Sequence, residues 1–330
     1  MIPVNEPRSV LVTGAGRGIG NAIALRLAAS GWRVWAGVRT DVAAKALAEA
    51  SGAITPVELD VTDRGHVAAL DTVLPARLDA LVNNVGIGVA GPLETLSPVD
   101  VHRQLDANLV GPLDVTRTVL PRLRRARGRI VFISSVNGRV SFPFTGIYNA
   151  SKFAVEAVAD CLRVELSPFG VQVALVEPGV VATDPWKHMD DLLDELEADL
   201  EPGLRSLYAG HFAGERRVLA DLRRRAAPPD DVARAVEQEL TRRRARPRTP
   251  VGRDARVILL MRTVLGARGM DRVWIRGLGL PRPPADGVPA TRPPWPSGAA
   301  QAAPPTSAAA DADAAPPASG GTRERPLPHP

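Results

Sequence analysis

The stretch Ser9-Val10-Leu11-Val12-Thr13-Gly14-Ala15-Gly16-Arg17-Gly18-Ile19-Gly20 decides the fold of this 330-residue chain. Its first five residues are mostly apolar and β-branched, a pattern typical of a buried parallel strand. A glycine-rich turn follows, and a helix containing Ile23, Leu25 and Leu27 then ends near Gly31. Such a turn brings backbone N–H groups close to a phosphate, and the helix N-terminus favours negative charge. The sequence therefore predicts a dinucleotide-binding turn, with a plain glycine-containing loop as the alternative.

Strand and helix patterns alternate beyond this turn. Five further strands are expected, at 33–38, 57–62, 78–82, 129–134 and 171–177. Short connections between alternating strands and helices predict a parallel, doubly wound α/β sheet with helices on both faces. The crossovers of such a sheet are right-handed, as in the Rossmann type of fold.

Two arginines near the end of the second predicted strand bear on the choice of dinucleotide. Arg39 directly follows this strand, and Arg17 lies in the glycine turn on the same side of the expected adenosine ribose. An acidic residue at this point suits the ribose of NAD, whereas an arginine suits the 2′-phosphate of NADP. Asp41, the one acid nearby, is expected to cap the next helix. The pattern favours NADP(H), with NAD(H) as the alternative.

Polar residues end several of the predicted strands. Asp60 lies near the end of the third predicted strand, where it could accept a hydrogen bond from adenine or cap the next helix. Asn83-Asn84-Val85-Gly86 ends the fourth strand, Ser134-Ser135 the fifth and Pro178-Gly179 the sixth. Ligands of open α/β sheets bind at the carboxyl edge of the strands, so these residues are expected to share one site.

A long helical stretch at 97–125 carries Asn108 among apolar residues. A buried Asn must find hydrogen-bond partners or cost about 1–3 kcal/mol. Gly111-Pro112 is expected to loosen the helix locally, and Pro121 to bend it again.

Tyr148 and Lys152 are four residues apart on a further predicted helix, so their side chains share one face. A lysine ammonium beside a phenol favours phenolate, and we expect the tyrosine pKa to fall below its ordinary value. A tyrosine tuned in this way can transfer a proton near neutral pH. The alternative is an unremarkable surface Tyr and Lys, which such a short motif often represents.

The regular repeat ends after Gly179. The segment 180–225 contains Trp186 and an acidic run in which Leu192, Leu193, Leu196 and Leu200 share one face. We interpret it as a helical lid over the substrate; a helix that only packs on the fold is the alternative. The basic, apolar stretch 253–279 is expected to close the core, and contact with a membrane surface is its alternative. Residues 1–280 are expected to form one domain, and the proline-rich segment 281–330 a disordered tail.

Composition narrows the classes of function. The net charge is +5, yet the basic residues are mostly arginines spread through helices, so no nucleic-acid partner is expected. Five scattered histidines and one cysteine offer no ligand cluster, so no metal is expected. The N-terminus has no apolar signal core, and no apolar run is long enough to span a membrane. A cytoplasmic location is the expectation.

These motifs, in this order, resemble those of the short-chain dehydrogenases/reductases in their short single-domain form. Residues 13–20 meet the family pattern T-G-x-x-x-G-I-G, and Ser135 lies thirteen residues before Tyr148, as the family spacing requires. Val85 stands where the family pattern has Ala. The resemblance covers 9–179 strongly and extends loosely to 280. It is closest to the NADP-preferring hydroxysteroid and retinol dehydrogenase group, on Val38-Arg39, Gly91-Pro92-Leu93-Glu94, Phe142-Pro143-Phe144 and the stretch 148–154.

The resemblance implies roles for individual residues. Tyr148 is implied to be the general acid or base, Lys152 to lower its pKa and bind the nicotinamide ribose, Ser135 to bind the substrate oxygen, and Asn108 to hold a helix and a water. Substrate contacts are implied for Ser135, Phe142, Tyr148 and Trp186. Cofactor contacts are implied for Gly14, Gly16, Arg17, Gly18, Ile19, Gly20, Arg39, Asp60, Val61, Asn84, Val85, Gly86, Tyr148, Lys152, Pro178, Gly179, Val181 and Thr183.

The sequence thus predicts an NADP(H)-dependent oxidoreductase that acts on a carbonyl or alcohol of a fairly apolar small molecule. A catalytically silent NADP(H)-binding regulator or scaffold is the main alternative. An epimerase or dehydratase of the longer related form is disfavoured by the short region after Gly179. A homo-oligomer is expected by analogy alone.

Overall fold

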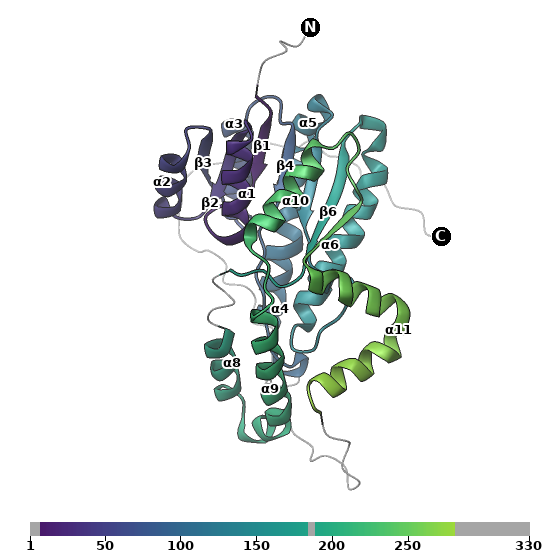
Figure 1. Cartoon of the computed structure of the whole chain (residues 1–330). Coiled ribbons are helices and arrows are strands. Elements are labelled where there is room, and N and C mark those ends of the chain that lie inside the picture. Colours follow the sequence, from purple (N-terminus) through teal and green to yellow (C-terminus); the bar gives the residue numbers. More distant parts are fainter. Residues whose placement is uncertain (1–6, 184–188, 281–330) are drawn as a thin grey trace, which may run out of the picture. The chain divides into compact units, whose positions relative to one another are not determined.

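The computed structural model describes residues 7–183 and 189–280. Its centre is a seven-stranded, wholly parallel sheet with the strand order β3-β2-β1-β4-β5-β6-β7 (Figure 1). The strands are β1 (Ser9–Val12), β2 (Arg33–Val38), β3 (Ile54–Glu58), β4 (Ala80–Asn83), β5 (Arg129–Ile133), β6 (Gln172–Pro178) and β7 (Arg248–Val251). Successive strands are added in one direction from β1 to β3 and in the opposite direction from β4 to β7, so the strand order reverses between β1 and β4, the switch point where such folds bind ligands.

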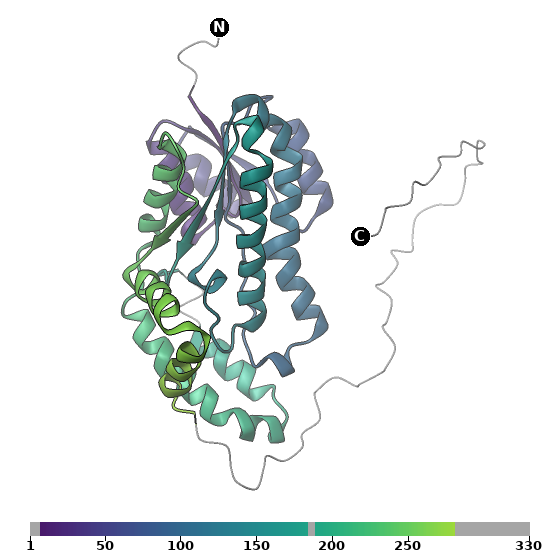
Figure 2. The same cartoon turned by 90° about the vertical axis from the view of Figure 1, so that its right-hand side faces the viewer.

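Helices cover both faces of the sheet (Figure 2). The helices that precede β6 in the chain are α1 (Gly18–Ala29), α2 (Asp41–Ala50), α3 (Arg64–Val73), α4 (Pro98–Leu105), α5 (Gly111–Ala126) and α6 (Gly146–Glu165). After β6 come α8 (Met189–Ala198), α9 (Pro202–Arg223), α10 (Pro229–Thr241) and α11 (Arg253–Gly277). Short helical turns are η1 (Leu93–Thr95), η3 (Val136–Gly138) and η4 (Ser167–Phe169), with a π-helical segment η2 (Asp106–Val110). The expected doubly wound α/β fold is confirmed.

Alternating side chains of the strands build two cores, one on each face of the sheet. Val10 and Val12 face the core that contains Ile23 of α1 and Val236 of α10. Leu11 faces the other core, formed with α3, α5 and α6. Successive strand residues point to opposite faces, so a strand covered on both sides reads as a continuous apolar run, as 9–13 does.

The stretch 97–126 forms one helical path with a local defect. The π segment η2 interrupts it between α4 and α5, directly before Gly111-Pro112, so the predicted loosening is confirmed. A Cβ at Gly111 would lie 2.6 Å from the Val61 carbonyl oxygen, which shows that this path passes close to the chain after β3. At Pro121, by contrast, α5 continues as one helix, and the bend expected there stays a prediction.

Two helix starts and two strands differ from the sequence-based expectations. The third strand, expected at 57–62, is β3 at Ile54–Glu58, so only its last two residues were predicted. Thr40, whose hydroxyl accepts from the Ala43 N–H, caps α2 instead of Asp41, which lies in the first turn. Asp63 caps α3 by accepting from two backbone N–H groups, so Asp60 is not a helix cap. Strand β7 was not predicted: it has four residues, including an arginine and a proline.

Helices α8 and α9 form a separate apolar cluster with the loop before α6. Leu193 of α8 and Leu204 and Phe212 of α9 are buried together with Phe144, which lies in the loop before α6. The predicted lid segment 180–225 therefore contains two helices that pack on this loop; Trp186 lies outside the described residues. Within the described parts of the chain, no helix combines the length and apolarity needed to cross a membrane.

Candidate active site

The glycine turn is held to the end of β4 by the side chain of Asn84. The Asn84 amide Nδ2 donates to the carbonyl oxygens of Thr13 (3.0 Å) and Gly14 (3.1 Å). A Cβ at Gly20 would lie 2.2 Å from the Gly14 carbonyl oxygen and 2.5 Å from Asn84 Nδ2, so only glycine fits there. Gly14 itself has φ +64°, a conformation that suits glycine. The glycine turn and the stretch 83–86 after β4 thus form one structural unit at the switch point.

Thr13 completes this unit and was not among the predicted site residues. Its hydroxyl accepts from the N–H groups of Asn84 (3.0 Å) and Val85 (3.2 Å) and donates to the Val82 carbonyl (3.4 Å). Each hydrogen bond joins the end of β1 to the end of β4. A threonine that ends a strand just before a glycine turn is the signal that could have indicated this role.

The two predicted nucleotide-selecting cations differ in their surroundings. Arg17 is exposed at the N-cap of α1. Arg39 is exposed after β2, with its guanidinium Nη1 3.6 Å from the Asp60 carboxylate. Burial favours a higher pKa for Asp60, but hydrogen bonds from Thr62 and the charge of Arg39 outweigh it and lower the pKa. Asp60 is therefore ionised and paired with Arg39, and its contact with adenine stays a prediction.

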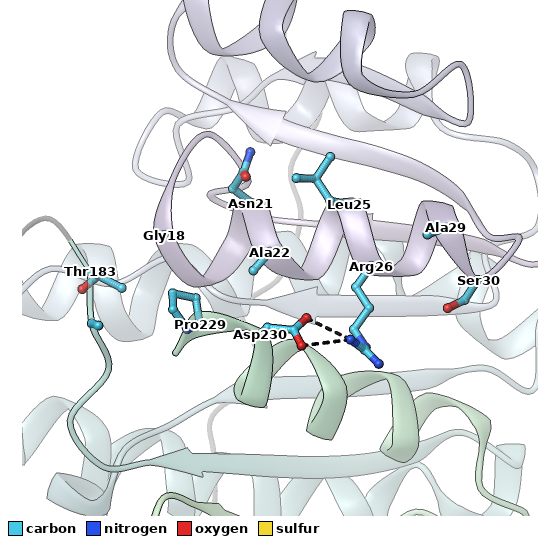
Figure 3. Close-up of a pocket in the computed structure, with 11 residues that line it drawn as sticks. Gly18, Asn21, Ala22, Leu25, Arg26, Ala29, Ser30, Thr183, Pro229 and Asp230 are labelled. Atoms are coloured by element: carbon cyan, nitrogen blue, oxygen red, sulfur yellow. Dashed lines mark hydrogen bonds and ion pairs between the residues drawn. The ribbon is translucent and has the colours of Figure 1, made fainter. Parts of the chain in front are cut away.

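The end of β6 lies beside the glycine turn. A Cβ at Gly18 would come within 3.3 Å of the Thr183 side chain, so two of the predicted cofactor residues are neighbours. Both line a cavity of about 720 Å³ between α1 and the start of α10, bordered also by Arg26 and Asp230, which form an ion pair of 2.9 Å (Figure 3).

The side chain of Asp254, at the start of α11, holds the loop after β6 by a hydrogen bond. Its carboxylate accepts from the Val180 N–H at 2.7 Å, and a Cβ at Gly179 would lie 2.1 Å from the same carboxylate. The Gly179 N–H donates to the Val251 carbonyl at 2.9 Å. The predicted Pro178-Gly179 turn therefore owes its shape to a residue of α11 and to β7, neither of which the motif itself indicated.

Asn108 lies in the π segment η2 and is 1% exposed. Its side-chain oxygen accepts from the Ile87 N–H (2.8 Å), and its Nδ2 donates to the Ile87 carbonyl (3.0 Å) and the Ser151 hydroxyl (3.0 Å). The buried amide is thus fully partnered. It ties the helix path at η2 to the chain after β4 and to α6, which agrees with the implied helix-holding role.

Lys152 is buried beside Asn108. Its ammonium donates to the Ile133 carbonyl at 2.9 Å, and the residue is 4% exposed. A Cβ at Gly86 would lie 3.4 Å from Lys152 Nζ and 3.5 Å from Asn108 Oδ1, so Gly86 leaves the two side chains room. Burial lowers the pKa of Lys152 to about 8, and the negative charge of Glu156 opposes this fall. Lys152 can therefore exchange its proton close to neutral pH.

Tyr148 and Ser135 face one another across the carboxyl edge of the sheet. Burial raises the pKa of Tyr148, and a hydrogen bond with the Ser135 hydroxyl lowers it only in part. Lys152 Nζ lies 5.8 Å from the centre of the Tyr148 ring. The expected fall in the tyrosine pKa is therefore wrong for this structure, because the cost of burying a phenolate exceeds the help from a lysine at that distance.

The arrangement supports proton donation. A phenol that keeps its proton at neutral pH, hydrogen-bonded to a serine, can protonate an oxygen placed beside both hydroxyl groups. Ser135 also accepts from the Asn137 N–H at 3.2 Å and lies 3.4 Å from the Pro178 carbonyl, which fixes its orientation. The structure thus brings Asn108, Ser135, Tyr148 and Lys152 together.

A second amide network beside Ser135 was not predicted. Asn137 Nδ2 donates to the Asn149 side-chain oxygen at 2.7 Å, and Asn149 Nδ2 donates to the Phe142 carbonyl at 2.8 Å. Thr145 joins both through its hydroxyl. These residues hold the loop between Ser135 and Tyr148 against the start of α6. Their positions, two residues after the serine and one after the tyrosine, were the available signal.

The loop 139–145 carries Phe142, an expected substrate contact, and we call it the predicted substrate loop. Aromatic contacts hold it from two sides. The ring of Phe142 lies 4.7 Å from that of Trp274 in α11, and the ring of Phe144 lies 5.0 Å from that of Phe212 in α9. Phe144 has φ +62°, a strained conformation for a bulky side chain. The packing of the Phe144 ring against Phe212 offsets this backbone strain. Phe142 thus lies near the predicted site.

Charged groups are buried behind the site. Glu177, fully buried at the end of β6, lies 3.4 Å from Arg248 Nε and 3.5 Å from Arg139 Nη1. The Glu156 carboxylate, one turn after Lys152, accepts from Arg248 Nε at 2.8 Å. Burial, and secondly the charge of Glu156, raise the pKa of Glu177 to about 7. Sequence patterns gave no indication of this cluster.

The fold and these motifs identify the class of protein. Residues 8–192 match the family model for short chain dehydrogenases, so the chain belongs to this family and is an oxidoreductase acting on CH–OH groups. It is close to the retinol and hydroxysteroid dehydrogenase group within the family.

Individual relatives support the same placement. The chain is 37% identical over 289 residues to retinol dehydrogenase 5 of Mus musculus, covering 83% of this chain and 89% of that protein. It is 32% identical to the 3-ketodihydrosphingosine reductase of Bacteroides thetaiotaomicron, over 75% of this chain and 88% of that protein. Human 17-beta-hydroxysteroid dehydrogenase type 1 is 41% identical over 187 residues, 53% of this chain and 57% of that protein.

Solved structures show the same fold. A short-chain dehydrogenase from Streptomyces avermitilis superposes with a TM-score of 0.67 at 27% identity, covering 82% of this chain and 96% of the other. A short chain dehydrogenase from Burkholderia cenocepacia, determined in complex with NADP, has a TM-score of 0.63 at 24% identity and covers 82% and 98%.

Proposed function

We propose that this oxidoreductase transfers hydride between NADP(H) and a carbonyl or alcohol group of a fairly apolar substrate: a ketone, an aldehyde, or a steroid-like or retinoid-like molecule. The observation that carries the proposal is the convergence of Ser135, Tyr148, Lys152 and Asn108 at the carboxyl edge of the sheet, beside the glycine turn.

The glycine turn fits a dinucleotide. Glycines at 14, 18 and 20 leave the turn without side chains, and added Cβ atoms would meet the turn's own backbone or its neighbours. The N-terminus of α1 supplies free N–H groups for the pyrophosphate. The nicotinamide supplies or accepts the hydride when bound. We expect Lys152 to hold the nicotinamide ribose, while Asn84 keeps the glycine turn in the shape that receives the pyrophosphate.

The proton follows a path through the chain's own residues. In carbonyl reduction the substrate carbon gains hydride while the Tyr148 phenol gives its proton to the substrate oxygen. The Ser135 hydroxyl donates a hydrogen bond to that oxygen as negative charge develops on it. The Lys152 ammonium then favours the resulting phenolate, and alcohol oxidation runs the same steps in reverse with Tyr148 as the base.

The preference for NADP(H) rests on charge at the end of β2. Arg17 and Arg39 are exposed there, and the strand carries no carboxylate where NAD-binding folds place one. The Arg39–Asp60 pair has a 3.6 Å separation and its arginine side chain is exposed, which leaves Arg39 able to turn toward a 2′-phosphate.

An apolar substrate is supported by two observations. The loop before α6 carries the half-buried Phe142, with Phe144 and Phe212 buried against one another behind it, and the names of the relatives refer to retinol, hydroxysteroid and ketodihydrosphingosine substrates. The lid role of α8 and α9 belongs to this proposal. The expected homo-oligomer and cytoplasmic location stay predictions.

A coupled absorbance screen tests the proposal. Ketone, aldehyde, steroid and retinoid panels are offered with NADPH and separately with NADH. Turnover with NADPH at a higher kcat/KM than with NADH supports it. Cofactor binding without turnover of any panel member would support the silent regulator instead, and a consistent preference for NADH would overturn the NADP(H) assignment.

A further inference from the structure

The helix α11 has two apolar sides, of which one is used by the fold. On the inner side, Ala255 and Met270 are buried with Val136 and Val140, which follow Ser135 in the chain. This contact confirms that the stretch closes the core, as the sequence predicted. The helix breaks at Gly266, where φ is +62°, and Figure 1 shows two segments at an angle to one another.

The other side of α11 is exposed. Val257, Leu260 and Val264 are 55%, 63% and 72% exposed, respectively. They are spaced by three and four residues, so they form one stripe along the first segment of the helix. We call this stripe the outer face of α11. Surface apolar residues are ordinary when scattered, but a stripe at helical spacing indicates a partner.

Unpaired positive charge surrounds the outer face. Six exposed arginines lie on α11: Arg253, Arg256, Arg262, Arg268, Arg272 and Arg276. Within 7–183 and 189–280, none of the six forms an ion pair, whereas Arg26, Arg216 and Arg248 elsewhere each pair with two or more carboxylates.

The charge balance of the helix is strongly positive. Two acids on α11, Asp254 and Asp271, set against six arginines leave a net charge of 6 − 2 = +4. The Asp254 carboxylate accepts a hydrogen bond from the Val180 N–H, so it faces the fold and not the outer face. Arg253 and Arg256 precede Val257 and Leu260 by four residues each, so two of the cations border the outer face directly.

These features together select one kind of occupant. A nucleic acid would neutralise the arginines but leave the apolar stripe uncovered. A second copy of the same face would cover the stripe but bring two +4 surfaces together. An anionic lipid surface supplies acyl chains for the stripe and phosphate groups for the arginines. We propose that the outer face of α11 docks in the plane of an anionic membrane surface.

Docking at this place would have a consequence for substrate access. The inner side of α11 contacts the predicted substrate loop through the 4.7 Å ring contact between Trp274 and Phe142. A docked α11 therefore holds that loop beside the lipid, where an apolar substrate dissolves. The docking itself does not depend on the proposed reaction, and it can be tested without turnover.

Vesicle co-sedimentation of the full chain tests the proposal. Sucrose-loaded vesicles of phosphatidylcholine alone are compared with vesicles containing about a third phosphatidylglycerol, because anionic lipid attracts each basic residue by about 1 kcal/mol. We expect binding to the anionic vesicles only.

The double variant Leu260→Glu/Val264→Glu should weaken partitioning by about tenfold or more, since it places charge where acyl chains lie. Arg253→Gln/Arg256→Gln should weaken it by about tenfold as well.

Matched variants control for general charge effects. Val42→Glu/Val99→Glu places the same two charges on α2 and α4, at side chains that are 82% and 74% exposed. Arg33→Gln/Arg244→Gln removes two exposed arginines away from α11. We expect both to bind anionic vesicles within about twofold of the unmodified chain, because charge outside the contact is screened by salt. Circular dichroism and thermal melting confirm that each variant folds.

Three results would overturn the proposal. One is that the unmodified chain sediments with neither kind of vesicle. Another is equal loss of binding in the α11 variants and in their matched controls, which would show that net charge alone drives association. The last is a mass measurement in which Leu260→Glu/Val264→Glu converts a dimer to a monomer, because the outer face would then belong to a second copy.

Discussion

Glu177 offers a quantitative test of the buried charge cluster behind the site. It is fully buried, and within the described residues its carboxylate forms two long ion pairs, at 3.4 Å and 3.5 Å. Burial, together with the neighbouring Glu156, raises the pKa of Glu177 from 4.5 to about 7. Glu177→Gln keeps the size of the side chain and removes the charge, so its effect on stability must depend on pH.

The sign follows from proton binding. Between pH 4.5 and about 7 the unfolded chain has lost the Glu177 proton while the folded chain keeps it. The free energy of unfolding contributed by this group therefore falls as pH rises through that window, and is lowest above it. From pH 5 to pH 8 the fall amounts to about 2 to 3 kcal/mol. Glutamine cannot ionise, so Glu177→Gln should gain this amount relative to the unmodified chain over the same range.

Urea unfolding at pH 5, 6, 7 and 8 measures the difference between the two proteins. Glu49→Gln on the surface of α2 is the control, with a difference within about 0.5 kcal/mol at every pH. A Glu177→Gln difference that stays constant from pH 5 to pH 8 would refute the reasoning, since it would show a carboxylate that folds already ionised.

Further predictions concern the site. In the reductive direction, kcat/KM should fall as pH rises past about 8, where Lys152 loses its proton. Glu156→Gln should move that midpoint to lower pH, because it removes a charge that holds the proton on Lys152. Gly20→Ala should abolish NADPH binding in calorimetry, since its Cβ would lie 2.2 Å from a backbone oxygen of the turn, whereas Gly52→Ala, with open space around it, should bind normally. Arg39→Glu should raise KM for NADPH at least about tenfold and leave KM for NADH within about twofold. A larger loss with NADH than with NADPH would contradict the assignment.

Sequence patterns predicted the parts of the fold that depend on local chemistry. Strands buried on both faces are continuous apolar runs, and helices have a regular apolar spacing, so six of the seven strands were expected. Strand β7 was missed because Arg248 and Pro250 are poor strand formers, and its pairing with β6 is a tertiary effect. Helix caps shifted by one to three residues because several polar residues compete at each start.

The site was predictable in its membership but not in its electrostatics. The structure brings the four predicted catalytic residues together, since their spacing and order follow the fold. The pKa of Tyr148 could not be predicted, because it depends on how deeply the phenol is buried. Thr13, Asn137 and Asp254 were missed for a similar reason: each acts through hydrogen bonds to residues distant in sequence.

The central claim is that Tyr148 transfers the proton that accompanies hydride transfer. The most direct measurement compares the unmodified chain with Tyr148→Phe, using NADPH affinity by fluorescence titration and the single-turnover rate with a substrate found in the screen. We predict that NADPH affinity stays within about threefold, while the rate falls by at least about a hundredfold, the usual share of a general acid. A Tyr148→Phe rate within tenfold of the unmodified chain would contradict the claim.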